Sequence, residues 1–285
     1  MSICTPPWLH ASQAIAAMEA GLHVLVEKPM AMSGDECREM CEVARRQGVQ
    51  LAIVHNFLFS RSVSRILSRV KEGRAGEVRG VLGFQMSTPR RRLPDWYDVL
   101  PGQLFFDESP HLVYLARKLL GPDEPVVLHA SSIQAPQEMV QRTQSVMAVV
   151  RSSRGLGTIS MNFNASRAEW GFTAIGSRES YIIDLFRDQF LVLGTGGTHS
   201  PVEVLAQTAS GLAHMAVGAI SSGALYATGR LLYGHDAVVS GFLEAIRRGI
   251  EPPVTGEEGH KTVTLMEGIC RAAGLVPDVD GKVPE

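Results

Sequence analysis

Apolar and polar residues alternate with two different periods in the first quarter of the chain. Short apolar runs at residues 2–5, 23–26 and 49–54 predict strands, and the intervening segments 10–20 and 33–48 have helical spacing. Strands joined by such short helical connections must be parallel and right-handed, with helices covering the sheet. The pattern therefore predicts three parallel strands whose carboxyl ends lie side by side.

Ser33 and Gly48 mark the expected ends of the second helix. Glu36 follows Ser33 at the spacing of a capping box, and glycine is the residue that most readily ends a helix in the left-handed conformation. A further helical segment at residues 61–70 is expected to link this region to the rest of the chain.

After about residue 77 the sequence pattern changes. Short strands now follow one another, and turn residues separate them. The expected strands cover residues 78–86, 126–133, 145–151, 157–163, 172–176 and 180–185. Helices are expected only at about 109–120 and 237–248. Such a run predicts a mostly antiparallel sheet, and so a second domain that differs in architecture from the first.

Composition narrows the classes of partner. The 285 residues carry a net charge of -2, so nothing in the charge balance favours nucleic-acid binding, and small molecules or other proteins are the expected partners. Four scattered cysteines and no secretory signal predict reduced thiols in the cytoplasm. Cys37 and Cys41 lie four apart on a predicted helix, but no histidine follows at ligand spacing, so we expect two packed cysteines and no metal site.

Residues 211–233 are nearly free of charge and almost long enough to span a bilayer. His214, Ser221, Ser222 and Arg230 interrupt this segment, and its glycines are dispersed. We therefore expect a close-packed soluble helix or an irregular loop, and no membrane partner.

The chain has no G-x-G-x-x-G after its first strand, no P-loop, no H-E-x-x-H and no G-x-S-x-G. A glycine cluster at 194–197, with His199 in the place of a last glycine, is better explained by a turn between strands. The candidate catalytic and binding residues are therefore dispersed along the chain. The first group of them lies at the carboxyl ends of the parallel strands, where open α/β sheets bind ligands. The residues at these ends are Thr5, Pro6 and His10, then Glu27, Lys28 and Pro29, then His55 and Asn56.

A second candidate group lies at residues 102–111. With Ser109 as N-cap and Pro110 at the first helical position, Asp107 and His111 are expected to approach each other at a helix entrance. A carboxylate near an imidazole can tune it as a general base. From the residues alone, a capping aspartate beside a helix-face histidine is the simpler interpretation.

Several motifs occur together in one order. Residues 3–10 read Ile-Cys-Thr-Pro-Pro-Trp-Leu-His, residues 23–29 read His-Val-Leu-Val-Glu-Lys-Pro, residues 73–78 read Gly-Arg-Ala-Gly-Glu-Val, and Asp107-x-x-x-His111 follows. This series resembles the Gfo/Idh/MocA family of nicotinamide-dependent sugar and polyol oxidoreductases over nearly all of the chain. The resemblance implies an α/β plus α+β fold. A truncated Rossmann-type parallel sheet at 1–58 is followed by a mostly antiparallel domain at 59–285, whose helices at 237–285 pack back on the first.

The resemblance also implies roles for the candidate residues. Lys28 would contact the substrate and the nicotinamide end of NAD or NADP, His111 would act as acid or base, and Asp107 would hold the substrate or orient His111. The nicotinamide side of the crevice would be lined by Thr5, Pro6, His10, Glu27, Pro29 and Asn56. The substrate would be a sugar, a polyol or a related hydroxyl compound. The antiparallel domain would form the contact of a homodimer or higher homo-oligomer.

The chain departs from the family pattern near the histidine. The approach to the aspartate is Pro101-Gly102-Gln103, Ser109 replaces a frequent glycine, and Tyr114 stands where an aspartate is often found. These changes leave the substrate open. Residues 90–92, three arginines, could meet an acidic group such as a uronate or phosphate, although a solvated basic run is the simpler interpretation.

A larger departure concerns the front of the chain. Met1 falls inside the first recognisable strand, which indicates a truncated reading frame or a misassigned start, and the turn that holds the pyrophosphate is missing. We therefore expect weakened nicotinamide binding, and the choice between NAD and NADP stays open because the residues that read the ribose are absent. A non-catalytic sugar-binding or dimerisation module and a decayed fragment are the alternatives to an active oxidoreductase.

Overall fold

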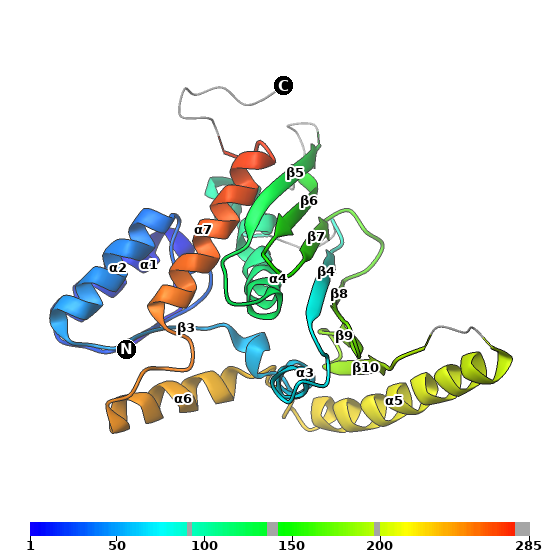
Figure 1. Ribbon diagram of the computed structural model, residues 1–285. Helices are drawn as coiled ribbons and strands as arrows, with labels where there is room; N and C mark the ends of the chain where they lie inside the picture. The colour runs from blue at the N-terminus through cyan, green and yellow to red at the C-terminus, as the bar shows by residue number, and fades with distance from the viewer. Residues whose placement is uncertain (90–92, 136–141, 197–199, 277–285) are drawn as a thin grey trace.

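Two β-sheets, one parallel and one mixed, organise the protein in a computed structural model that describes residues 1–89, 93–135, 142–196 and 200–276 (Figure 1). The first sheet contains β1 (Ser2–Ile3), β2 (Val24–Val26) and β3 (Leu51–Ile53) in that order, and both pairings are parallel. Helices α1 (Pro7–Glu19) and α2 (Gly34–Gln47) connect the strands. The predicted strand and helix order is confirmed, and α1 begins three residues earlier than expected because proline suits the first turn of a helix.

The ends of α2 follow the predicted capping chemistry. Ser33 Oγ accepts a hydrogen bond from Glu36 N at 3.2 Å, and Gly48 ends the helix with φ 65°. The Glu36 carboxylate reaches back to Met32 N at 2.8 Å, one residue before the cap. On the same helix, Cys37 and Cys41 are buried, so the prediction of two packed cysteines is confirmed, and burial raises the pKa of Cys41 to about 12.

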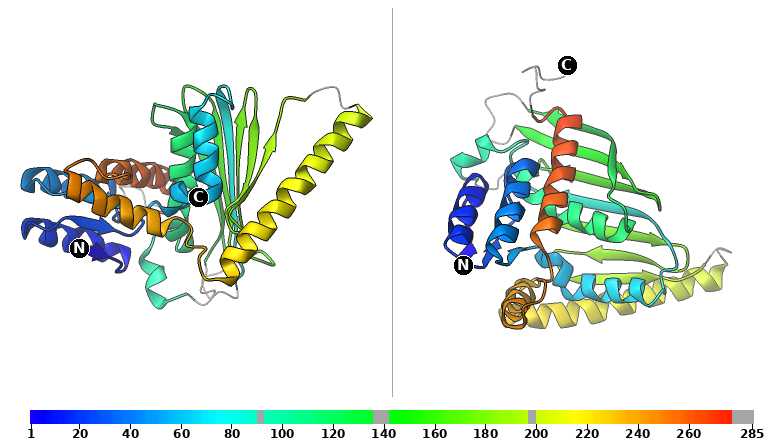
Figure 2. Two further views of the ribbon diagram at one scale, coloured as in Figure 1. Left: turned by 90° about the horizontal axis from the view of Figure 1, so that it is seen from below. Right: turned by 60° about the vertical axis from the view of Figure 1, so that its left-hand side comes forward.

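Both faces of the parallel sheet are covered, as its apolar strands require. On one face lie α1 and α2, and α7 (Gly256–Ala272) packs beside α2. On the other face, α6 (His235–Arg248) places Val238 and Phe242 against β2 and β3. Figure 2 shows α7 running from this sheet toward the second one. Helices α6 and α7 thus pack against the N-terminal sheet, and a domain boundary near residue 58 stays a proposal.

The second sheet has the order β10-β9-β8-β4-β7-β6-β5, and its only parallel pairing among the described strands is β4 with β7. Its strands are β4 (Val78–Met86), β5 (Val126–Gln134), β6 (Thr143–Arg151), β7 (Leu156–Asn162), β8 (Glu169–Gly176), β9 (Ser180–Asp184) and β10 (Gln189–Leu193). The mostly antiparallel prediction is confirmed. β10 was not predicted, because this edge strand is only partly buried and its apolar residues do not alternate with polar ones.

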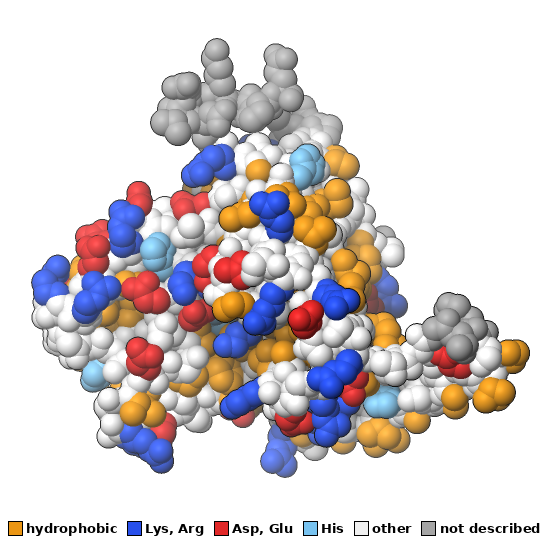
Figure 3. Space-filling view, viewed as in Figure 1, with side chains coloured by type: hydrophobic (Ala, Val, Ile, Leu, Met, Phe, Trp, Pro, Cys, Tyr) orange, Lys and Arg blue, Asp and Glu red, His pale blue; other side chains and the backbone are white. Residues whose placement is uncertain are grey.

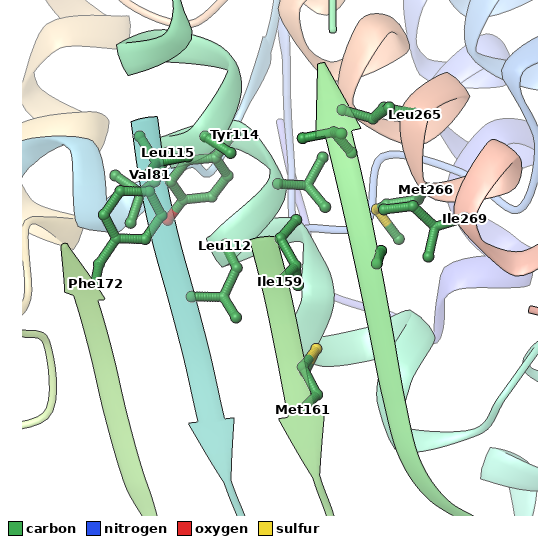
Figure 4. Close-up of a cluster of buried hydrophobic side chains, with 14 of the residues drawn as sticks. Val81, Leu112, Tyr114, Leu115, Ile159, Met161, Phe172, Leu265, Met266 and Ile269 are labelled. Atoms are coloured by element: carbon green, nitrogen blue, oxygen red, sulfur yellow. The ribbon is translucent and has the colours of Figure 1, made fainter. Parts of the chain in front are cut away.

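One face of this sheet holds the main core. Figure 4 shows Leu112 and Leu115 of α4 (Leu104–Leu120) against Val81, with Ile159 and Phe172 of the neighbouring strands in the same cluster. Leu265, Met266 and Ile269 of α7 continue the cluster toward β5. The linking helix α3 (Arg61–Lys71) and the short 3-10 helices η1 (Asn56–Phe59) and η2 (Asp95–Val99) complete this side.

The predicted start of α4 at Ser109 is wrong. The helix begins at Leu104, so Ser109 does not cap it and Pro110 lies inside it. Phe105 and Phe106 are buried at 0% and 1% exposure. Burying each ring stabilises the fold by about 1.5–3 kcal/mol. Together these gains offset the cost of an internal proline, about 3 kcal/mol.

Helix α5 (Pro201–Ala227) also differs from its prediction. The expectation of a close-packed helix or an irregular loop is wrong, because within α5 only Ser222 is buried and the helix slants away from the sheet beyond β10 (Figure 2, left). Figure 3 shows hydrophobic side chains along its surface. Among the described residues, α5 is the one helix that is long and apolar enough to cross a membrane by length and composition, which by itself is weak evidence of a span.

Candidate active site

Lys28 follows β2 and reaches across to the first turn of α4. Its Nζ donates to Asp107 Oδ1 at 2.7 Å and to the Asp107 backbone oxygen at 2.8 Å. Tyr97 donates its hydroxyl to the other carboxylate oxygen of Asp107 at 2.8 Å. The Lys28 and Asp107 side chains are only 17% and 16% exposed, so this ion pair is poorly screened by water. The pair therefore fixes the ammonium group where the parallel sheet meets α4.

A cavity of about 320 Å³ opens beside this pair. Four of its lining residues come from the predicted set: Glu27, Lys28, Asn56 and His111. The other lining residues are Phe57, Trp170, Leu185, Phe186, Tyr233 and His235. The volume lies near the lower end of ordinary ligand pockets, about 300–1,000 Å³. The carboxyl ends of β2 and β3 thus share one hollow with a histidine of the second domain.

His111 pairs with Tyr114 and not with Asp107. Its Nδ1 lies 2.9 Å from the Tyr114 hydroxyl, whereas both Asp107 oxygens are bonded to Lys28 and Tyr97. Among the described residues, Asp107 thus bonds Lys28 and Tyr97, and no hydrogen bond joins it to His111. Burial lowers the pKa of His111 well below its usual value, and the nearby Lys28 charge adds to this. His111 is neutral at neutral pH.

Thr5, Pro6, His10 and Pro29 lie outside the residues that line the cavity. His10 is buried, and its two ring nitrogens lie 2.9 Å from the Pro29 oxygen and 2.7 Å from the Thr5 oxygen. Thr5 donates its hydroxyl to Gln13 at 2.8 Å. His10 thus ties together the loops after β1 and β2 and so supports the loop that carries Lys28.

Sequence reasoning missed the aromatic wall of the cavity. The Phe57 ring lies 4.7 Å from the His111 ring, and the Trp170 ring lies 5.5 Å from it. Tyr233 faces Phe57 at 6.1 Å and receives the Asn56 Nδ2 hydrogen bond on its backbone oxygen at 3.2 Å. These residues come from η1, β8 and the segment before α6, so no local sequence signal joins them. Residues 90–92 and His199 lie outside the described residues.

The site has no cluster of metal-ligand type. Across the described ranges, no group of three or more His, Cys, Asp or Glu residues could hold a metal ion. The polar groups that line the cavity are the carboxylate of Glu27, the ammonium group of Lys28, the amide of Asn56 and the imidazoles of His111 and His235.

The first 55 residues of the chain match a known protein family. The Gfo/Idh/MocA family model, described as an oxidoreductase family with an NAD-binding Rossmann fold, matches residues 1–55. D-glucoside 3-dehydrogenase of Escherichia coli is 37% identical over 139 residues, which are 47% of this chain and 39% of that protein. 1,5-anhydro-D-fructose reductase of Ensifer adhaerens is 30% identical over 63% of this chain and 55% of its own length. The chain thus spans less than two thirds of these relatives.

Solved structures show the same fold. Levoglucosan dehydrogenase in complex with NADH and L-sorbose superimposes with a TM-score of 0.73 at 22% identity, over 95% of this chain and 76% of that one. The WlbA dehydrogenase from Bordetella pertussis, in complex with NADH and UDP-GlcNAcA, gives 0.73 at 21% identity over the same shares. The parallel sheet followed by the mixed sheet is therefore an arrangement that this chain shares with dehydrogenases.

Proposed function

Because the chain belongs to the Gfo/Idh/MocA family of oxidoreductases, we propose that it transfers hydride between NAD or NADP and a hydroxyl group of a sugar, a polyol or a related compound. The observation that carries the proposal is the convergence of Lys28 and His111 on one cavity at the carboxyl ends of β2 and β3. Ligands bind at such strand ends in open α/β sheets.

The residues at the cavity suit the nicotinamide end of the cofactor. Asn56 Oδ1 accepts no hydrogen bond from the described residues and offers the acceptor that a carboxamide needs. Glu27, Lys28 and Asn56 would hold this end, with Phe57 as an apolar surface. When bound, the nicotinamide supplies the hydride acceptor or donor.

The protein's own groups then act on the substrate oxygen. The Lys28 ammonium donates a hydrogen bond to this oxygen and stabilises negative charge on it, while the ion pair with Asp107 holds the ammonium group in position. His111 lines the same cavity, so its imidazole is a second group that can act on this oxygen, as a hydrogen-bond donor or as an acid or base, depending on which ring nitrogen carries hydrogen. Trp170, Phe186 and Tyr233 offer aromatic faces to the apolar C–H face of a sugar ring.

Cofactor binding and turnover test the proposal directly. We expect the fluorescence of NADH or NADPH to change on titration with the protein, and reduced cofactor to form when NAD or NADP is supplied with a panel of hexoses, glycosides and inositols. The His111→Asn variant is the control, because it keeps a polar side chain but removes the imidazole. If neither protein turns over any substrate, yet a sugar raises the melting temperature, the chain is instead a non-catalytic sugar-binding module.

We also propose that a second copy of the chain covers the outer face of the mixed sheet. Leu82 and Phe84 of β4 are each 45% exposed there, and Met147 of β6 and Ile182 of β9, which lie two strands away on either side, are 48% and 43% exposed. The apolar surface of α5 lies on the same side of the sheet (Figure 2, left). A contiguous apolar surface of this kind is typical of an interface between subunits.

Light scattering during size-exclusion chromatography checks this interface. We expect a dimer or higher oligomer for the native chain and a shift toward monomer for Phe84→Glu, because the carboxylate loses its hydration when the two faces meet. Leu22→Glu is the matched control, since Leu22 is 46% exposed and lies after α1, away from the mixed sheet. A native chain that is monomeric at micromolar concentration contradicts the proposal.

A further inference from the structure

Tyr114 places a buried hydroxyl directly behind His111. The side chain lies one helical turn after His111 on α4 and is 2% exposed. Its ring stacks on His55, with centroids 4.3 Å apart and an interplanar angle of 19°. The position of the hydroxyl is therefore set by packing on the ring as well as by its hydrogen bonds.

The Tyr114 hydroxyl contacts two polar atoms, one that can only donate a hydrogen bond and one that can accept. Phe57 N donates a hydrogen bond to the hydroxyl oxygen at 3.0 Å, and a backbone N–H can only donate. Within the described residues, the hydroxyl contacts one other polar atom, His111 Nδ1 at 2.9 Å. Nδ1 is therefore the acceptor for the single hydroxyl hydrogen.

This arrangement selects one form of the neutral imidazole. If Nδ1 accepts the Tyr114 hydrogen, the ring must carry its own hydrogen on Nε2. The opposite tautomer would point Nδ1–H at the hydroxyl and leave the hydroxyl hydrogen buried without an acceptor. Because a buried hydrogen-bond donor without an acceptor is costly, the population of the Nδ1–H tautomer should be lower than that of the Nε2–H tautomer by roughly 10- to 100-fold.

Nε2 is the ring nitrogen of His111 that remains for a ligand. It contacts no hydrogen-bonding atom of the described residues, and it does not belong to their buried polar atoms that lack a partner. The His111 ring packs among the rings of Phe57, Trp170 and Tyr114, and His111 itself lines the cavity, so Nε2 is the nitrogen that can bond a substrate there.

We infer that Tyr114 is a positioning residue that holds His111 as a hydrogen-bond donor, with Nε2–H aimed at the substrate oxygen. The inference rests on the proposed function and refines the role of His111 in it. An Nε2 that already carries hydrogen cannot take a proton, so proton exchange with the substrate oxygen falls to Lys28. In the direction of reduction, the carbonyl carbon gains the hydride of the reduced nicotinamide. One N–H bond of Lys28 breaks and an O–H bond forms, which leaves a neutral amine that solvent reprotonates.

The tautomer of His111 can be measured without cofactor or substrate. In protein labelled with ¹⁵N-histidine, an imidazole nitrogen that carries hydrogen resonates far from one that does not, and His111→Asn identifies the signals of His111. We expect a protonated Nε2 and an unprotonated Nδ1 in the native chain at neutral pH. A native chain with hydrogen on Nδ1 overturns the inference, whatever its activity.

Tyr114→Phe then tests the cause. Without the hydroxyl, Nδ1 loses its donor, and we expect the Nδ1–H tautomer to rise by at least about tenfold relative to Nε2–H. Tyr181→Phe is the matched control, because it removes another buried hydroxyl whose partner is Glu179, on a different element from His111. An unchanged tautomer in Tyr114→Phe contradicts the inference.

The kinetic readout separates this inference from the proposed function. In an active chain, Tyr114→Phe should lower kcat by roughly tenfold and leave the KM of the cofactor unchanged, because the hydroxyl acts through His111 on the reacting oxygen. An unchanged kcat in a variant whose tautomer has shifted would overturn the role of Nε2–H. A native chain with the expected tautomer but no turnover would instead count against the proposed function.

Discussion

Replacing Lys28 by methionine should lower kcat for hydride transfer by about 10²- to 10³-fold, the loss typical of removing one preorganised donor from a developing oxyanion. Methionine keeps the length and apolar stem of the side chain but removes the ammonium group. In the native chain that group is aimed by two hydrogen bonds to Asp107, so it needs no reorganisation when charge appears on the substrate oxygen.

Steady-state kinetics with the best substrate of the panel measures this loss, and circular dichroism checks that the variant is folded. Lys118→Met is the matched control, because Lys118 lies on α4, the helix that carries Asp107, but is exposed to solvent. We expect the control to retain native kcat. A Lys28→Met variant within threefold of the native rate would show that the ammonium group takes no part in the reaction.

The position of Lys28 was predictable because it depends on local pattern. Apolar runs of strand length, Ser33 as a cap and Gly48 as a stop determine a parallel sheet, and in such a sheet the residue after β2 must lie at the ligand-binding edge. No packing detail is needed for that inference.

The partner of Lys28 was not predictable in the same way. Asp107 lies 79 residues further along the chain, and its direction depends on where α4 begins. The sequence pattern placed that start at Ser109, since proline favours the first turn of a helix. Burial of Phe105 and Phe106 outweighs this local preference, and the earlier start turns Asp107 toward Lys28.

The other features that the sequence did not predict depend on contacts between residues that are far apart in the chain. Phe57, Trp170 and Tyr233 meet at one cavity from three separate segments, and no spacing in the sequence connects them. The charge-poor segment in α5 has the composition of a buried helix, so its exposure in the single chain could not be inferred from hydropathy. Composition indicates that an apolar surface is expected to be buried, but it does not indicate whether the same chain or another molecule buries it.

The second large effect concerns stability and depends on Arg117, which joins α4 to α7. Its side chain is 5% exposed and binds both oxygens of Glu124, at 2.7 and 2.9 Å. Its Nη1 also donates to Thr262 Oγ1 at 3.0 Å and to Glu258 Oε2 at 3.3 Å. The helix that presents Asp107 and His111 is thus held by a nearly fully bonded guanidinium.

Arg117→Met should lower the free energy of unfolding by about 3 kcal/mol, near the lower end of the range for breaking a buried charge pair. The lower end applies because Glu124 and Glu258 are 47% and 45% exposed and regain water when the arginine is lost. For a chain of this size the change corresponds to a decrease of roughly 6–12 °C in melting temperature. Urea unfolding and a thermal melt at neutral pH measure it.

Lys261→Met is the matched control, because Lys261 contacts the same two carboxylates at 3.4 and 3.7 Å but is 45% exposed. An exposed pair of this kind contributes at most about 1 kcal/mol. Equal losses in the two variants would show that the charges, and not the buried geometry of Arg117, account for the effect.

The pH dependence of the Arg117 effect follows from Glu124. Hydrogen bonding to Arg117 holds the pKa of the Glu124 carboxyl below its usual range in the folded chain, whereas the unfolded chain titrates near the usual value, about 4.3. Above that value the stabilising pair is fully charged, and it is lost as the pH falls through the lower, folded pKa. The difference in unfolding free energy between native and Arg117→Met chains should therefore stay constant from pH 8 to about pH 5 and narrow below about pH 4. A difference that instead grows in acid would mean that Arg117 does not stabilise the fold through this carboxylate.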